Sequence, residues 1–116
     1  MIAYIACPYS SPYENVRRLR FEAANRCAGA LMARGEVVFS PISHTHPIAE
    51  QCELPKGWEY WNKYDRAMLS QCVKVYVLTI DGWMESVGVA AELKIANELG
   101  LPVEYITEDG EIWQEP

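Results

Sequence analysis

The sequence has few positively charged residues with which to bind a polyanion such as nucleic acid. It contains 10 lysine and arginine residues against 16 aspartate and glutamate residues, which gives a net charge of −6 at pH 7. General binding of nucleic acid needs a basic face that displaces counterions from phosphates, and the sequence contains no basic cluster. We therefore expect no nucleic-acid polymer as a partner. A small polar ligand remains compatible with the negative net charge, because the local field of a pocket need not follow it.

Long apolar runs and paired cysteines are also missing. No run approaches the roughly 20 apolar residues of a membrane-spanning helix, and the start MIAYIA lacks the basic residues and long apolar core of a signal peptide. We expect a cytoplasmic protein without a membrane partner. The cysteines form no CxxC pair and lack metal-ligand spacing, so we expect free, half-buried thiols, no metal and no cofactor. These cysteines are Cys7, Cys27, Cys52 and Cys72.

Short apolar runs alternate with helical patterns along the chain. Half of the residues are apolar, enough for one core, and no linker or repeat divides the sequence, so we expect one domain over residues 1–116. Gly35 and Gly100 are expected to end helices, and Ser86 to cap one. The expected strands are 2–6, 36–39, 73–80 and 103–106, and the expected helices are 12–33, 58–70 and 87–99. Residues 42–57 are expected to be mainly loop, with one helical turn near 48–50.

This alternation predicts right-handed βαβ crossovers, and hence an α/β fold with a parallel sheet covered by helices on both faces. In such sheets, ligands bind beyond the carboxyl ends of the strands. Three polar or glycine-bearing segments follow the first three expected strands, at residues 7–10, 40–46 and 81–86. We expect them to line one pocket.

Two carboxylates lie on the apolar faces of expected helices. At about 100° per residue, Glu92 lies within the apolar arc of helix 87–99, and Gly88, one turn earlier, leaves room for a ligand above it. Asp65 lies within the apolar arc of helix 58–70. An acid that points into a core is costly unless it is paired, protonated or facing a cavity. The arc around Asp65 comprises Trp58, Tyr60, Trp61, Tyr64, Ala67, Met68 and Leu69.

Each acid could instead pair with a buried arginine, or the helical phase could be shifted by one residue. Two such acids together with Gly88 favour a shared pocket, because perturbed acids cluster at functional sites. Paired carboxylates around one anomeric carbon commonly break glycosidic bonds, with one as nucleophile or base and the other as acid on the leaving group. The positions of the two carboxylates on the helical faces therefore predict cleavage of a glycosidic bond, but they do not indicate which sugar carries it.

Three short motifs occur in the order and spacing of a known enzyme family. The opening YIACPY at 4–9, DG at 81–82 followed by GVAAE at 88–92, and Asp65 followed by AML at 67–69 resemble the nucleoside 2-deoxyribosyltransferase family over roughly residues 2–103. SVGVAAEL at 86–93 looks still more like its deoxynucleoside 5′-monophosphate N-glycosidase branch. The chain also resembles a small uncharacterised bacterial group with the same fold.

The resemblance implies a three-layer flavodoxin-like or Rossmann-like parallel sheet of four to five strands and a covalent glycosyl-enzyme. Glu92 would attack the anomeric carbon of a nucleoside or its 5′-monophosphate, Asp65 would protonate the departing base, and Tyr4 would hold Glu92 by a hydrogen bond. Water as acceptor would give a hydrolase, and a second base a transferase. Related pockets are completed across subunits, so a homo-oligomer is implied. The expected substrate-binding residues are Cys7, Pro8, Tyr9, Ser10, His44, Asp81, Ser86 and Gly88.

Other polar and aromatic residues have alternative interpretations. His44 and His46 lack a third metal ligand, so we expect a polar rim in which His44 contacts the base. Arg20 lies in the apolar arc of the first helix and could reach a phosphate or a pocket acid, or extend past the sheet edge. The aromatic residues Trp58, Tyr60, Trp61, Tyr64 and Trp83 are expected mainly in the core or at a subunit interface, with some stacking on a base.

Two alternatives to the enzyme hypothesis come from other functional classes. A non-catalytic nucleotide-binding module would keep the fold and the pocket, and an ion pair between Glu92 and Arg20 would disable the nucleophile. A structural oligomeric domain built around its aromatic patch would have no cavity above Gly88.

Overall fold

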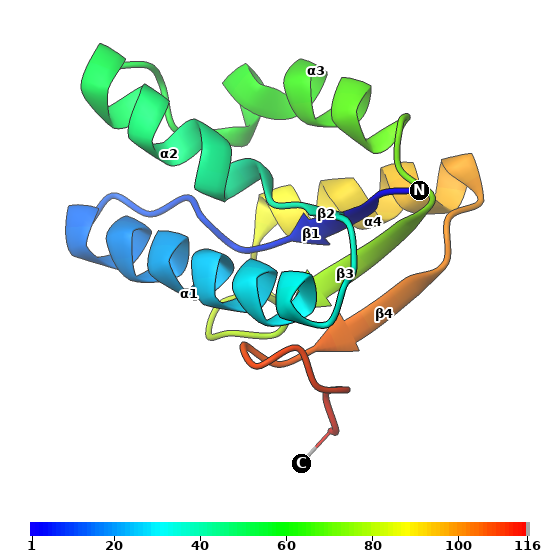
Figure 1. Cartoon of the computed structure of the whole chain (residues 1–116). Helices are drawn as coiled ribbons and strands as arrows, with labels where there is room; N and C mark the ends of the chain where they lie inside the picture. The colour runs from blue at the N-terminus through cyan, green and yellow to red at the C-terminus, as the bar shows by residue number, and fades with distance from the viewer. Residues whose placement is uncertain (116) are drawn as a thin grey trace.

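Strands and helices alternate along residues 1–115, the part of the chain that the computed structural model describes (Figure 1). The strands are β1 (Ala3–Ala6), β2 (Val38–Phe39), β3 (Lys74–Leu78) and β4 (Val103–Ile106). The helices are α1 (Glu14–Ala33), α2 (Pro41–Cys52), α3 (Trp58–Leu69) and α4 (Val87–Leu99). Within these residues, no helix combines the length and the apolar character needed to cross a membrane.

The four strands form one parallel sheet in the order β2-β1-β3-β4. Successive side chains of β1 point to opposite faces of the sheet, which divides the core in two. Ile5 belongs to the cluster that α1 covers, and Tyr4 belongs to the cluster on the other face, below α3 and α4. Figure 1 shows α1 and α4 on opposite sides of the sheet. The predicted three-layer α/β fold is therefore confirmed.

Local sequence signals predicted both ends of α4 and of β4 at the residues where they lie. The Ser86 side chain accepts a hydrogen bond from the backbone N–H of Val89 at 3.1 Å, and Gly100 ends α4 in the left-handed conformation with φ 72°. The other strands are shorter than expected. The largest difference is at β3, which has five residues where eight were predicted, and the edge strand β2 has two where four were predicted.

The prediction of a loop over most of residues 42–57 is wrong, because α2 occupies Pro41–Cys52. Pro41 stands in the first turn of the helix, where no intrahelical N–H bond is lost. Pro47 lies inside the helix and removes one such bond, a cost of about 3 kcal/mol that usually ends a helix. Burial of Ile42, His46 and Ala49 on one face, with α2 packed against α1, compensates for this cost.

The four cysteines are free, as predicted. Cys7, Cys27 and Cys72 are buried, whereas Cys52 is exposed at the end of α2.

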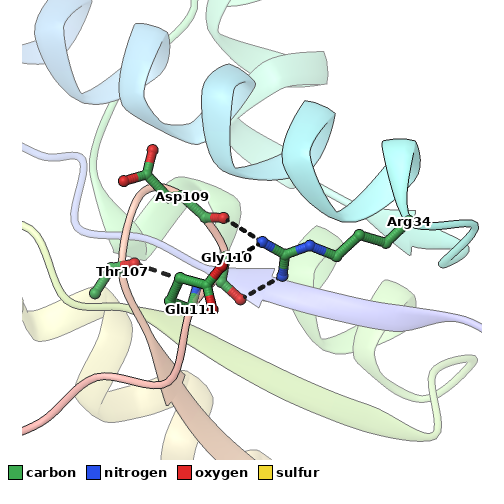
Figure 2. A network of polar contacts seen from close by, with 5 residues as sticks. All are labelled: Arg34, Thr107, Asp109, Gly110 and Glu111. Carbon is green, nitrogen blue, oxygen red and sulfur yellow. Dashed lines mark hydrogen bonds and ion pairs between the residues drawn. The ribbon is translucent and has the colours of Figure 1, made fainter.

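The segment after β4 folds back along the outer edge of the sheet. The Trp113 N–H donates to the Tyr105 carbonyl at 2.9 Å, and Ile112 forms an antiparallel bridge with Ile106. Figure 2 shows how Arg34, just beyond the end of α1, holds the turn: its guanidinium donates to the carbonyls of Asp109 and Gly110, each at 2.8 Å, and to the Glu111 carboxylate.

We expect Arg34→Ala to loosen this segment, because three hydrogen bonds are lost at once. The free energy of unfolding should fall by about 1 kcal/mol, and the Trp113 amide should exchange faster with solvent. Arg26→Ala is the matched control. Its ion pair with Glu108 is exposed to solvent, so its loss should cost less than about 0.5 kcal/mol. Unchanged exchange at Trp113 in Arg34→Ala would show that Arg34 does not hold the segment.

Candidate functional site

A cavity opens at the carboxyl edge of the sheet, where the predicted pocket was placed. It lies between the loop after β1, helix α2, the start of α3 and the N-terminal half of α4. The two predicted carboxylates, Glu92 and Asp65, both line it, although they are 27 positions apart on different helices. The other predicted residues in its lining are Cys7, Tyr9, Ser10, Ser86 and Gly88.

Glu92 is the most deeply placed charged group in the cavity. It is 4% exposed, and its Oε2 accepts a hydrogen bond from the hydroxyl of Tyr4, which is fully buried on β1. Burial raises the pKa of Glu92, and the nearby Asp65 carboxylate raises it further, whereas the Tyr4 hydrogen bond opposes this shift. The contact between Tyr4 and Glu92 that the resemblance implied is present, and Tyr4 reaches Glu92 from behind the cavity lining.

Asp65 provides a second perturbed carboxyl group. Burial raises its pKa to about 7, so a large fraction carries a proton at neutral pH. Part of the predicted apolar arc around it faces solvent instead, because Tyr60 is 50% exposed and Ala67 is also exposed. The inward face of α3 is therefore narrower than the sequence pattern indicated, yet it includes Asp65.

A cavity is present beside Gly88, in contrast to the expectation for a purely structural domain. A Cβ atom at position 88 would be 3.8 Å from Ser86 Oγ and 3.8 Å from Trp58 Cε3, which is ordinary contact. A side chain there would thus fit next to its neighbours, but it would extend into the space in front of Glu92. The glycine keeps that space open.

Arg20 does not disable Glu92. Its guanidinium donates to the backbone carbonyl of Ser10 at 3.0 Å and to that of Asp81 at 3.5 Å. It thereby joins the loop after β1 to the loop after β3. The ion pair that would have favoured a non-catalytic binding module is absent from the described residues.

The structure places three expected substrate-binding residues outside the cavity lining. Pro8 is fully buried beneath its loop. Asp81 is exposed, and its carbonyl contacts Arg20. His44 is exposed as well, and its predicted contact with the base followed from the wrong prediction of a loop over residues 42–57. On the actual helix α2, residues 44 and 46 point about 200° apart, so His46 faces the cavity and His44 faces away.

His46 is the main lining residue that the sequence analysis did not single out as a ligand contact. Trp58 and Trp61 belong to the aromatic patch of which some members were expected to stack on a base, and both line the cavity. The Trp61 indole N–H donates to the Pro55 carbonyl at 2.7 Å, which fixes its ring. Lys56 also lies at the rim, paired with Glu50 at 3.1 Å. Tryptophans three residues apart at a helix start were an available signal, whereas nothing in the sequence marked Lys56.

No group of three or more histidine, cysteine, aspartate or glutamate side chains in residues 1–115 is arranged to hold a metal ion. Burial raises the pKa of Cys7, and the neighbouring Glu92 raises it further, so this thiol stays protonated and is a poor nucleophile. The cavity lining contains two carboxyl groups, Glu92 and Asp65, and the phenol of Tyr4 contacts one of them.

Comparison with known proteins identifies a family. No curated protein matches the sequence. Residues 1–108 match the family described as "Domain of unknown function (DUF1937)", a match that covers both carboxylates and every strand. The chain belongs to the DUF1937 family.

Proposed function

We propose that the protein cleaves or transfers the N-glycosidic bond of a nucleoside, or of its 5′-monophosphate, through a covalent glycosyl-enzyme. One observation carries the proposal: Glu92, held by the Tyr4 hydroxyl, and Asp65, with its raised pKa, line the same cavity. The motif resemblance to deoxyribosyltransferases supports deoxyribose as the sugar. The two acids support the reaction independently of that resemblance.

In the productive form, Glu92 is ionised and Asp65 carries the proton. The Tyr4 hydroxyl donates to Glu92 and stabilises its anion, which is needed because burial disfavours that charge. A carboxylate oxygen of Glu92 attacks the anomeric carbon while the bond from this carbon to the base nitrogen breaks. Asp65 passes its proton to the departing base and is left as a carboxylate.

The second step regenerates both acids. The Asp65 carboxylate takes a proton from a water molecule, whose oxygen attacks the anomeric carbon and releases the sugar and the Glu92 carboxylate. If a second base attacks in place of water, the product is a new nucleoside and the enzyme acts as a transferase. Both outcomes use the same two carboxyl groups.

The substrate is a small molecule with an aromatic leaving group. Trp58 and Trp61 give the cavity two indole rings on which a base can stack. Part of the aromatic surface remains open, with Tyr60 exposed beside Trp61, which supports a homo-oligomer. The net charge of −6 argues against a nucleic-acid polymer as the substrate. We place this activity in the cytoplasm.

Base release tests the proposal directly. The purified protein is incubated with a panel of deoxynucleosides and ribonucleosides and their 5′-monophosphates, and free base is followed by chromatography. Glu92→Ala serves as the control for contaminating activity. Release by the native protein alone establishes glycosidic cleavage, and the preferred substrate identifies the sugar and the need for phosphate. Binding without release across the panel would instead support a non-catalytic nucleotide-binding module.

A further inference from the structure

Arg20 on α1 lies outside the cavity lining, yet its guanidinium contacts two loops that help to form the cavity. These are the loop after β1, residues 7–13, and the loop after β3, residues 79–86. The Nη1 atom donates to the Ser10 carbonyl at 3.0 Å, and Nη2 donates to the Asp81 carbonyl at the longer distance of 3.5 Å. The two nitrogens of one planar group thus serve one loop each.

The two loops leave the sheet in opposite directions. β1 and β3 are neighbours in the order β2-β1-β3-β4, so the chain after β1 leads to β2 and the chain after β3 leads to β4. Helices α1 and α4, which follow the two loops, cover opposite faces of the sheet (Figure 1). A crevice opens where connections diverge in this way. Residues 7–13 and 79–86, all of them described by the structure, share no backbone hydrogen bond, so the guanidinium supplies a link that the backbone lacks.

Gly82 leaves the space that this guanidinium occupies. A Cβ atom at position 82 would overlap Nη2 of Arg20 and lie 3.3 Å from its Cζ. Gly82 also has a φ of 93°, in the left-handed region that favours glycine. Any other residue would push the guanidinium away from the carbonyls that it holds. The glycine and the arginine therefore act as one unit.

The linked loops carry residues of the cavity wall, whereas the two acids are held elsewhere. Tyr9 and Ser10 come from the first loop, and Ser86 comes from the second. Glu92 and Asp65 lie on α4 and α3, beyond both loops. A change in the spacing of the loops should therefore alter ligand binding more than the chemical step.

We propose that Arg20 is a positioning residue for ligand binding: packed against Gly82, it sets the spacing of the two loops that form part of the cavity wall. The inference rests on the proposed function only for the identity of the ligand.

Steady-state kinetics of base release tests the role in binding. Arg20→Ala should raise KM about fivefold, the effect of one net hydrogen bond, with kcat changed less than about twofold. Arg20→Lys keeps the positive charge but has one nitrogen in place of two, so most of this rise should remain. The rise should be equal for a nucleoside and its 5′-monophosphate. A native KM in Arg20→Lys, or a rise confined to the monophosphate, would overturn the proposal and indicate simple attraction between charges.

A double-mutant cycle with Gly82→Ala tests whether the glycine and the arginine act together. Gly82→Ala alone should raise KM about fivefold, because the methyl group displaces the guanidinium. Combined with Arg20→Ala, it should add nothing further, whereas independent effects would multiply to about 25-fold. The backbone strain of alanine at position 82 should lower Tm in both backgrounds, which separates stability from binding. Multiplicative effects on KM would contradict the proposed unit.

Amide hydrogen exchange of the ligand-free protein separates this inference from the proposed function. In Arg20→Ala, amides in residues 7–13 and in residues 79–86 should exchange about tenfold faster. Arg18→Ala is the matched control, because Arg18 is an exposed arginine on the same helix, and it should keep the native exchange and the native KM. Acceleration in neither loop, or in only one, would refute the link. Absence of base release by the native protein would refute the proposed function, while the exchange would still decide whether Arg20 joins the loops.

Discussion

Glu92→Gln will abolish base release and, at the same time, make the protein more stable at pH 8. The amide cannot attack the anomeric carbon, so we expect a loss of at least about 10³-fold in kcat. Its oxygen can still accept the Tyr4 hydrogen bond, so the fold and ligand binding should persist. Rapid-quench or chromatographic assays of base release measure the first effect, and ligand titration checks the second.

The gain in stability follows from the raised pKa of Glu92. The folded protein binds the carboxyl proton more tightly than the unfolded chain, so ionisation costs the folded state more. Native stability is therefore full below the unfolded pKa, near 4.5, and declines as the pH rises through the folded value. Glutamine removes this cost. We expect a gain on the order of 2 kcal/mol at pH 8, or roughly 5–10 °C in Tm, that vanishes near pH 4.

Thermal unfolding at pH 4 and at pH 8 measures this difference. Glu98→Gln is the matched control on the same helix, because Glu98 is exposed and pairs only distantly with Arg66, at 3.6 Å. Its effect should stay within about 0.5 kcal/mol at both pH values. A Glu92→Gln protein that still releases base at the native rate would eliminate Glu92 as the nucleophile.

Asp65→Asn will slow base release by about 10²–10⁴-fold when the leaving base is poor. A base that departs as an anion needs a proton, and asparagine cannot supply one. A deoxyribosyl donor with a nitrophenolate leaving group needs no such proton, so the variant should form the glycosyl-enzyme from it at close to the native rate. The burst of nitrophenolate in a stopped-flow experiment measures this first step.

The pH dependence provides a second test of Asp65. Its pKa of about 7 predicts that base release, measured relative to the nitrophenolate burst that needs only ionised Glu92, falls as the pH rises above about 7, because the general acid loses its proton. The nitrophenolate burst should lack this alkaline decline. Equal slowing of both leaving groups in Asp65→Asn would contradict the role of general acid and indicate a role in binding.

The parts of the fold that the sequence predicted well are those set by local chemistry. Helix α4 has a strong apolar period, a serine cap and a terminal glycine, and these fixed both its ends. The same period placed Glu92 inward, because a helix that packs on a sheet has only one buried face. The candidate nucleophile was therefore identifiable from the sequence alone.

Helix α2 shows why the other parts of the fold and of the site could not be predicted from the sequence. Pro47 is an unfavourable residue inside a helix, and only the burial of His46 and its neighbours against α1 outweighs that cost. Because this helix was predicted as a loop, the sequence analysis chose His44, whereas His46 is the histidine that lines the cavity. The partners of Arg20 were equally hidden, because they are backbone carbonyls of two loops, and any residue type could provide a carbonyl.

The two edge strands of the sheet limit how copies of this chain can associate. β2 has only two residues, and the outer edge of β4 is occupied by the returning segment that Arg34 holds. Neither edge offers a long row of unpaired N–H and C=O groups to a strand from another molecule. An assembly of this protein must therefore be built through its helical and aromatic surfaces, and growth into a continuous intermolecular sheet is disfavoured.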